Sequence, residues 1–205
     1  MERALAESEI RAPWYALNGI LSAWSIERAR GDAVEADRWR VAANKIFDGS
    51  DPGIRTQRLR ALVDGKLDSL EHDFIDDFLT FTGRLDHVAF ILAALADRRL
   101  GTATSGLDEM IAYTDECSIL LVSSMARRLR GQRRHDETDL RDALAAFERM
   151  EARPHVARAK SEIGLLIGDS ALVEAAIGEL ESIGDLEHAT RVVAEQRAAK
   201  TAIAR

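Results

Sequence analysis

The sequence predicts an all-α protein: a right-handed solenoid of about five helix pairs, with a leading helix and a C-terminal capping helix. Two observations support this fold class. Aromatic residues make up 5 % of the chain and hydrophobic residues 46 %, so small and aliphatic side chains must form the core, as in closely packed helices. Glycines also follow helix-like runs at intervals of 34, 36, 30 and 37 residues, which is typical of stacked helix–turn–helix units: Gly31, Gly65, Gly101, Gly131 and Gly168.

Capping residues and apolar periodicity predict the helices of the first half. The first eleven residues form the leading helix, and Pro13 begins a helix over 13–30 that Gly31 ends. Asp32 caps the next helix, and a turn at 48–53 separates it from a short helix over 54–64. After Gly65, apolar residues at i, i+3 and i+4 spacing predict a helix that Gly83 closes: Leu67, Leu70, Phe74, Phe78 and Phe81.

The second half is expected to continue in the same way. Helices are predicted over 86–99, from about 105 to 116, over 118–130 up to Gly131, and from the cap Thr138 onward. Pro154 begins a helix over 154–167, Gly168 leads into 170–183, and Gly184 introduces the last helix. We expect one domain over 1–205, with repeats at 13–53, 54–83, 84–116, 117–152 and 153–184 and a cap helix at 185–205. The turn at Gly184 also allows 170–183 to be the first helix of a pair, so the pairing phase there stays open.

Composition restricts the class of protein. The net charge of −7 favours solubility and disfavours nucleic acid or an anionic membrane as the main partner. The single cysteine, Cys117, excludes an internal disulfide, favours a reducing compartment and is expected to be buried. The longest apolar run, 88–96, is too short to span a bilayer, and acidic residues interrupt any N-terminal signal sequence. We therefore expect a cytoplasmic protein.

Two segments carry a resemblance to known families. Gly31-Asp32-Ala33-Val34-Glu35-Ala36, with Trp39, Ala43 and Asp51-Pro52 after it, resembles the second half of a tetratricopeptide repeat, and 184–189 is similar to the same turn. The stretch 140–168 resembles the C-terminal helical repeats of large bacterial signalling ATPases, although that family commonly has glycine where Glu151 stands. In that family such repeats accompany an ATPase domain with either a class III nucleotide cyclase domain or a LuxR-type DNA-binding domain.

The resemblance implies a non-enzymatic, protein- or peptide-binding region of a bacterial signal-transduction or transcriptional regulator. The sequence contains no GxxxxGK[ST] phosphate loop, and no cofactor is expected. In such folds the first helices of successive pairs line a groove. The residues expected to contact a partner there are mostly arginines, which favours an acidic peptide: Tyr15, Asn18, Arg58, Arg98, Arg127, Arg128 and Arg158.

An acidic, histidine-containing stretch at 68–87 gives an alternative function. His72 and Asp76 stand one helical turn apart, and with Asp73 and Asp86 they form a candidate set of nitrogen and oxygen ligands for a divalent cation. The alternative is a metal-dependent hydrolase that uses these four residues. The competing interpretation is a solvated acidic face opposite the phenylalanines, because the stretch contains no HExxH motif. His155 and His188 are expected on the surface.

Overall fold

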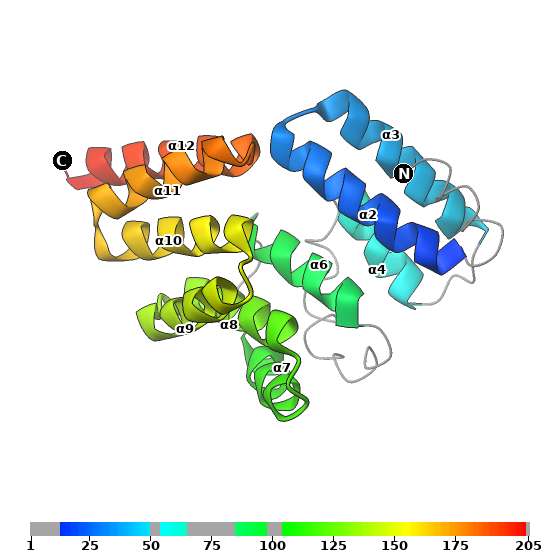
Figure 1. The fold of residues 1–205 in the computed structure, drawn as a ribbon, viewed down its shortest axis with the longest axis horizontal. Coiled ribbons are helices and arrows are strands. Elements are labelled where there is room, and N and C mark those ends of the chain that lie inside the picture. Colours follow the sequence, from blue (N-terminus) through cyan, green and yellow to red (C-terminus); the bar gives the residue numbers. More distant parts are fainter. Residues whose placement is uncertain (1–12, 50–53, 65–84, 98–103, 204–205) are drawn as a thin grey trace. The chain divides into compact units, whose positions relative to one another are not determined.

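The chain is all-helical, as a computed structural model that describes residues 13–49, 54–64, 85–97 and 104–203 shows (Figure 1). Ten α-helices and no strand occur in these residues, which confirms the all-α prediction. The chain divides into two compact units, 1–70 and 71–205, and each is described by itself. The expectation of one continuous repeat domain stays a prediction.

The first unit contains α2 (Pro13–Arg30), α3 (Ala33–Asp48) and α4 (Ile54–Val63). Helix α3 packs against both α2 and α4. The predicted boundaries are confirmed where capping chemistry sets them: α2 begins at Pro13, and Gly31 has the left-handed φ of 76°. Asp32 caps α3 by accepting a hydrogen bond from the Glu35 amide at 3.0 Å. The buried side chains that join the three helices are mainly aliphatic, with one aromatic ring: Leu17, Ile20, Leu21, Ala43, Phe47, Leu59 and Leu62.

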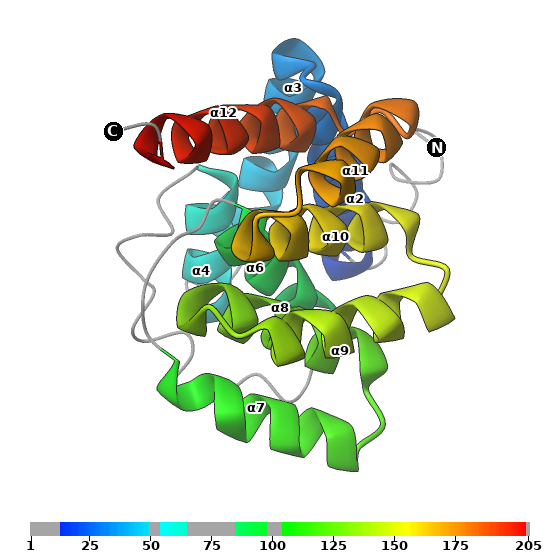
Figure 2. The same cartoon turned by 90° about the vertical axis from the view of Figure 1, so that its left-hand side faces the viewer.

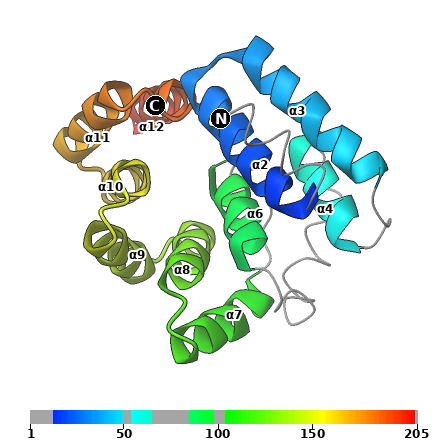
Figure 3. The same cartoon turned by 45° about the vertical axis from the view of Figure 1, so that its right-hand side comes forward.

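The second unit contains seven described helices, and its later helices stack in chain order (Figure 2). They are α6 (Leu85–Asp97), α7 (Ser105–Glu116), α8 (Leu120–Arg134), α9 (Glu137–Arg149), α10 (Arg153–Ile167), α11 (Ser170–Ser182) and α12 (Leu186–Ile203). From α7 onward each helix packs against the next, and α8 to α11 are seen in this succession in Figure 3. In addition, α6 packs on α8 and α10 packs on α12. The even-numbered helices therefore form one layer and the odd-numbered helices another.

This unit repeats with a period of 33 residues. Helices α8, α10 and α12 begin at 120, 153 and 186, and α9 and α11 begin at 137 and 170. The turn before each even-numbered helix contains a residue with positive φ: Ser118 (57°), Glu151 (54°) and Gly184 (79°). The same backbone hydrogen bond closes the three turns, from the amides of residues 119, 152 and 185 to the carbonyls of residues 114, 147 and 180, at 2.7, 3.0 and 2.9 Å. Backbone geometry thus repeats even where glycine does not.

Gly131 does not end a helix, and that prediction is wrong. It lies inside α8, which continues to Arg134 and is ended by His135 with φ 52°. A Cβ atom on Gly131 would lie 2.9 Å from Leu140 Cγ and 3.0 Å from the Asp136 carbonyl oxygen. The glycine therefore permits α9 to approach α8 closely. Gly164 has the same role 33 residues later, where a Cβ would lie 2.8 Å from Val173 Cγ2.

Other expected boundaries have mixed outcomes. Gly168 and Gly184 have left-handed φ values after α10 and α11, as predicted, whereas Gly65 and Gly101 lie outside the described residues. The cap of α9 is Asp136, which accepts from the Thr138 amide at 2.9 Å, so Thr138 is not the cap. Cys117 is exposed at the end of α7, and the prediction that it is buried is wrong.

Candidate functional site

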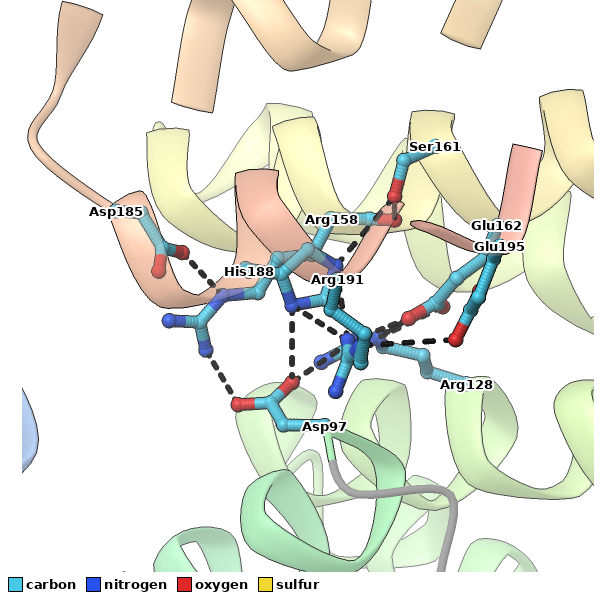
Figure 4. A network of polar contacts seen from close by, with 9 residues as sticks. All are labelled: Asp97, Arg128, Arg158, Ser161, Glu162, Asp185, His188, Arg191 and Glu195. Carbon is cyan, nitrogen blue, oxygen red and sulfur yellow. Dashed lines mark hydrogen bonds and ion pairs between the residues drawn. The ribbon is translucent and has the colours of Figure 1, made fainter. Parts of the chain in front are cut away.

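Charged side chains from α6, α8, α10 and the start of α12 meet in one cluster, here called the polar network (Figure 4). Its core lies between helices that carry few other buried charges. Its members are Asp97, Arg128, Arg158, Ser161, Glu162, Asp185, His188, Arg191 and Glu195.

Arg128 lies at the centre of the polar network and is 0 % exposed. Its Nε donates to Glu162 Oε2 at 2.9 Å, and its Nη2 donates to Asp97 Oδ1 at 2.8 Å and to Glu162 Oε1. Burial opposes the charge of this guanidinium, but Glu162 and Asp97 outweigh burial and raise the pKa of Arg128. A buried charge is tolerated only when it is paired and hydrogen-bonded, so Arg128 ties α8 to both α6 and α10.

Arg158 makes the second link of the polar network. Its Nη1 donates to Asp97 Oδ2 at 2.7 Å, and its Nε donates to Asp185 Oδ2 at 2.7 Å. Asp97 is the last residue of α6 and keeps 25 % of its side chain exposed. Burial opposes its charge, but Arg158 and Arg128 outweigh burial and hold the pKa of Asp97 well below its usual range. One carboxylate therefore joins the ends of three elements.

His188 is a neutral member of the polar network and is 3 % exposed. Burial, together with the neighbouring Arg191, lowers its pKa to about 2. Arg191 Nη2 lies 2.7 Å from His188 Nδ1, so Nδ1 acts as an acceptor and the ring proton is assigned to Nε2. That proton faces Ser161 Oγ at 3.5 Å.

Ser161, His188 and Asp97 contain the residue types of a hydrolytic triad, but their geometry differs from one. A general base must accept the serine proton, whereas His188 Nε2 carries a proton in this tautomer and Ser161 Oγ donates to the Arg158 carbonyl at 2.7 Å. His188 Nδ1 lies 3.9 Å from Asp97 Oδ1, beyond a hydrogen bond. The arrangement therefore serves to hold helices together and has no activated nucleophile.

The motif His-x-x-Arg-x-x-x-Glu occurs twice in this region, 33 residues apart. The first copy is His155, Arg158 and Glu162 in α10, and the second is His188, Arg191 and Glu195 in α12. His155 is half-buried, with its ring 5.1 Å from that of Phe147, and burial lowers its pKa to about 3.

The surface position expected for His188 is wrong, and a search for this 33-residue spacing would have indicated its burial. The glycine intervals concealed that spacing, because Gly131 and Gly168 occupy different positions in their repeats.

The predicted partner-binding residues are only partly brought together. Arg128 and Arg158 share Asp97, and Arg127 forms an ion pair with Asp115 at the edge of α7 and α8. Asn18 is partly buried in α2 of the first unit. The side chains of Tyr15 and Arg58, and the whole of Arg98, lie outside the described residues.

The rest of the basic run in α8 also binds carboxylates of the chain itself. Arg130 donates from Nε and Nη2 to the two oxygens of Asp139, both at 2.6 Å, and from Nη1 to Asp108 at 2.6 Å. Arg134 donates to the other oxygen of Asp108 at 2.7 Å. Hydrogen bonds to Asp139 raise the pKa of Arg130. These ion pairs connect α7, α8 and α9.

The alternative metal site falls on undescribed residues. His72, Asp73 and Asp76 lie outside the described ranges, as does the side chain of Asp86. Within 13–49, 54–64, 85–97 and 104–203, no group of three His, Cys, Asp or Glu residues is arranged to hold a metal ion.

A pocket of about 160 Å³ adjoins the polar network in the second unit. Glu162 belongs to both, with its carboxylate paired to Arg128 on one side. The Gln132 Nε2 atom is buried and has no hydrogen-bond partner. The lining comes from the last turns of α8 and α10 and the start of α9: Gly131, Gln132, His135, Leu140, Glu162, Leu165 and Leu166. Such a pocket can bind a small group that is largely apolar and has one polar end.

No family model, curated protein or solved structure matches this chain. Among the described residues, no helix has both the length and the apolar character needed to cross a membrane.

Proposed function

We propose that the chain is a non-enzymatic helical repeat module that binds a protein or peptide, in the interaction or regulatory region of a bacterial signalling or transcriptional regulator. The observation that carries the proposal is the 33-residue repetition of α8–α9 and α10–α11, with equivalent turns at 118, 151 and 184. A tetratricopeptide-like solenoid is the arrangement that such helix pairs favour. In these folds the repeats display a surface to a partner.

The polar network supports a binding role through rigidity. A partner is bound with less loss of conformational entropy when the helices that contact it are already fixed relative to one another. Arg128 and Arg158 bind carboxylates on α6, α10 and the start of α12, so they fix the even-numbered helices directly. Buried ion pairs of this kind specify an arrangement more than they add stability.

The chemistry of the partner is not read from the arginines. Arg127, Arg128 and Arg158 were expected to bind an acidic peptide, yet each binds an acidic residue of this chain. Apolar residues at the ends of the even-numbered helices are exposed instead, namely Leu120, Leu186 and Ile167. Their exposure favours a partner with apolar contacts at these positions.

The proposal is tested by capture followed by a binding measurement with purified components. The full chain is labelled at Cys117, which is exposed and the only cysteine. A captured protein must then bind the labelled chain saturably and with a fixed stoichiometry. Leu186→Asp should weaken binding by tenfold or more, whereas Glu187→Gln, at the adjacent exposed position, should leave it unchanged. A captured protein that binds the heat-unfolded chain equally well would refute the proposal.

A further inference from the structure

The pocket lined by Gln132, Glu162 and Leu165 joins two features that together select a ligand. Leu140, Leu165 and Leu166 supply apolar walls, and Gln132 and Glu162 supply polar groups. Its volume of about 160 Å³ is close to that of cavities of roughly 150 Å³ that accept benzene. One six-membered ring or a side chain of similar size therefore fits.

The two polar groups require a ligand that both donates and accepts. Glu162 accepts from Arg128, but a carboxylate offers about four acceptor positions, so further capacity remains. The Gln132 amide nitrogen has no partner and is a donor in need of an acceptor. A hydroxyl group satisfies both groups at once. It also suits the opposite orientation of the amide, because it can donate to Oε1 as well as accept from Nε2.

Charge excludes the other common polar ends. A carboxylate or phosphate would lie against Glu162, which is buried and negatively charged. A cation is disfavoured because Arg128 already neutralises Glu162 and the last turn of α8 carries Arg133 and Arg134. A purely apolar ring would leave Gln132 without a partner, which costs affinity.

We propose that this pocket receives the tyrosine side chain of a protein partner. The ring packs on the leucines, and the phenolic hydroxyl donates to Glu162 and accepts from Gln132. His135 is exposed at the end of α8, so the pocket has a side that a partner can reach. Tyrosine is frequent among the residues that dominate protein interfaces, because its ring is rigid and its hydroxyl finds a partner. This inference rests on the proposed function and specifies where the partner binds.

The test uses p-cresol, the side-chain analogue of tyrosine, and leucine methyl signals of the full chain in NMR titrations. We expect p-cresol to shift the methyl signals of Leu140, Leu165 and Leu166 and to bind about tenfold more tightly than toluene, which lacks the hydroxyl. Butylammonium should bind more weakly than p-cresol. The tyrosine proposal is overturned if none of the three leucines responds to p-cresol, or if toluene or butylammonium binds as tightly.

Variants separate the pocket from general effects on the fold. Gln132→Leu should lower p-cresol affinity about tenfold and leave toluene affinity unchanged or higher. Gln196→Leu is the matched control, because Gln196 Nε2 is also buried without a partner but lies on α12 outside the pocket lining. Equal effects of the two substitutions would overturn the proposal. Leu166→Trp, which fills the pocket, provides a second variant that should abolish p-cresol binding.

Two further measurements distinguish the source of the phenol and the two levels of the argument. N-acetyl-tyrosinamide should bind and N-acetyl-phenylalaninamide should not, whereas binding of p-cresol alone would mean that a free phenol occupies the pocket and would refute a partner's tyrosine. A captured partner that binds Leu166→Trp as well as the unaltered chain would overturn this inference but leave the proposed function standing. Absence of any partner together with p-cresol binding would do the reverse.

Discussion

Substitution of Arg128 by methionine tests the polar network most directly. Arg128 is fully buried and pairs with Glu162, which is itself only 3 % exposed. Removing one member of a buried ion pair leaves the other charge uncompensated and costs about 3–5 kcal/mol. Asp97 loses one partner but keeps Arg158 at 2.7 Å, so the larger penalty falls on Glu162. For a chain of this length the expected fall in Tm is roughly 6–20 °C.

The double variant Arg128→Met/Glu162→Leu separates the effect of an unpaired charge from the effect of lost packing. Replacing both members by apolar side chains of similar volume is neutral or stabilising in many buried pairs, by about 1–4 kcal/mol. We therefore expect the double variant to recover most of the stability that Arg128→Met loses. Arg141→Met is the matched control, because the Arg141–Glu137 pair at 2.6 Å is exposed and contributes about 0.3–0.5 kcal/mol.

The assay is urea unfolding at pH 7, followed by circular dichroism and by fluorescence of a label on Cys117. The label reports on the second unit, which contains both Cys117 and the polar network. Two results refute the reasoning: a loss below about 1 kcal/mol for Arg128→Met, which is the scale of an exposed pair, or a double variant as unstable as the sum of its single variants.

Three further predictions concern glycines, a histidine and the cysteine. Gly131→Ala and Gly164→Ala should each destabilise by about 1–3 kcal/mol through overpacking, whereas Gly178→Ala, where no atom lies within 4 Å, should stabilise by up to about 1 kcal/mol in urea unfolding. Because the pKa of His188 falls from 6.5 to about 2 on folding, its contribution to stability is complete above pH 6.5 and is lost as the pH decreases below that value. The stability of a His188→Gln variant, measured from pH 7 to pH 4, should therefore fall less steeply than that of the unaltered chain. An equal slope would contradict this assignment. Cys117 should react completely with a maleimide in the native state, and a requirement for denaturant would show that it is buried.

The helix boundaries set by local chemistry were predictable from the sequence. Pro13, Gly31 and Asp32 act within one turn of their own positions, because a missing N–H, a left-handed φ and a capping carboxylate are local properties. The same holds for Gly168 and Asp169 before α11, where Asp169 accepts from the Leu172 amide at 3.0 Å. These residues determine where helices begin and end regardless of what packs on them.

Other turns were not predictable, because identical residues serve different roles. Ser118 and Glu151 take left-handed φ values that glycine would signal, and the neighbouring helices hold them there. Gly131 gives the signal of a helix end, yet it lies within α8 because α9 approaches it there. The tertiary structure alone distinguishes a glycine that turns the chain from one that admits a neighbour.

The sequence by itself determined that the chain is helical and where several helices are capped. The tertiary structure decided which charges are buried. Arg128 and Arg158 have the composition and spacing of exposed helix residues, and their carboxylate partners lie 31, 34, 61 and 27 residues away. A sequence shows an arginine without its partner, whereas burial depends on whether the fold brings a carboxylate within hydrogen-bond distance. That depends on the packing of α6, α8, α10 and α12, which no local pattern encodes.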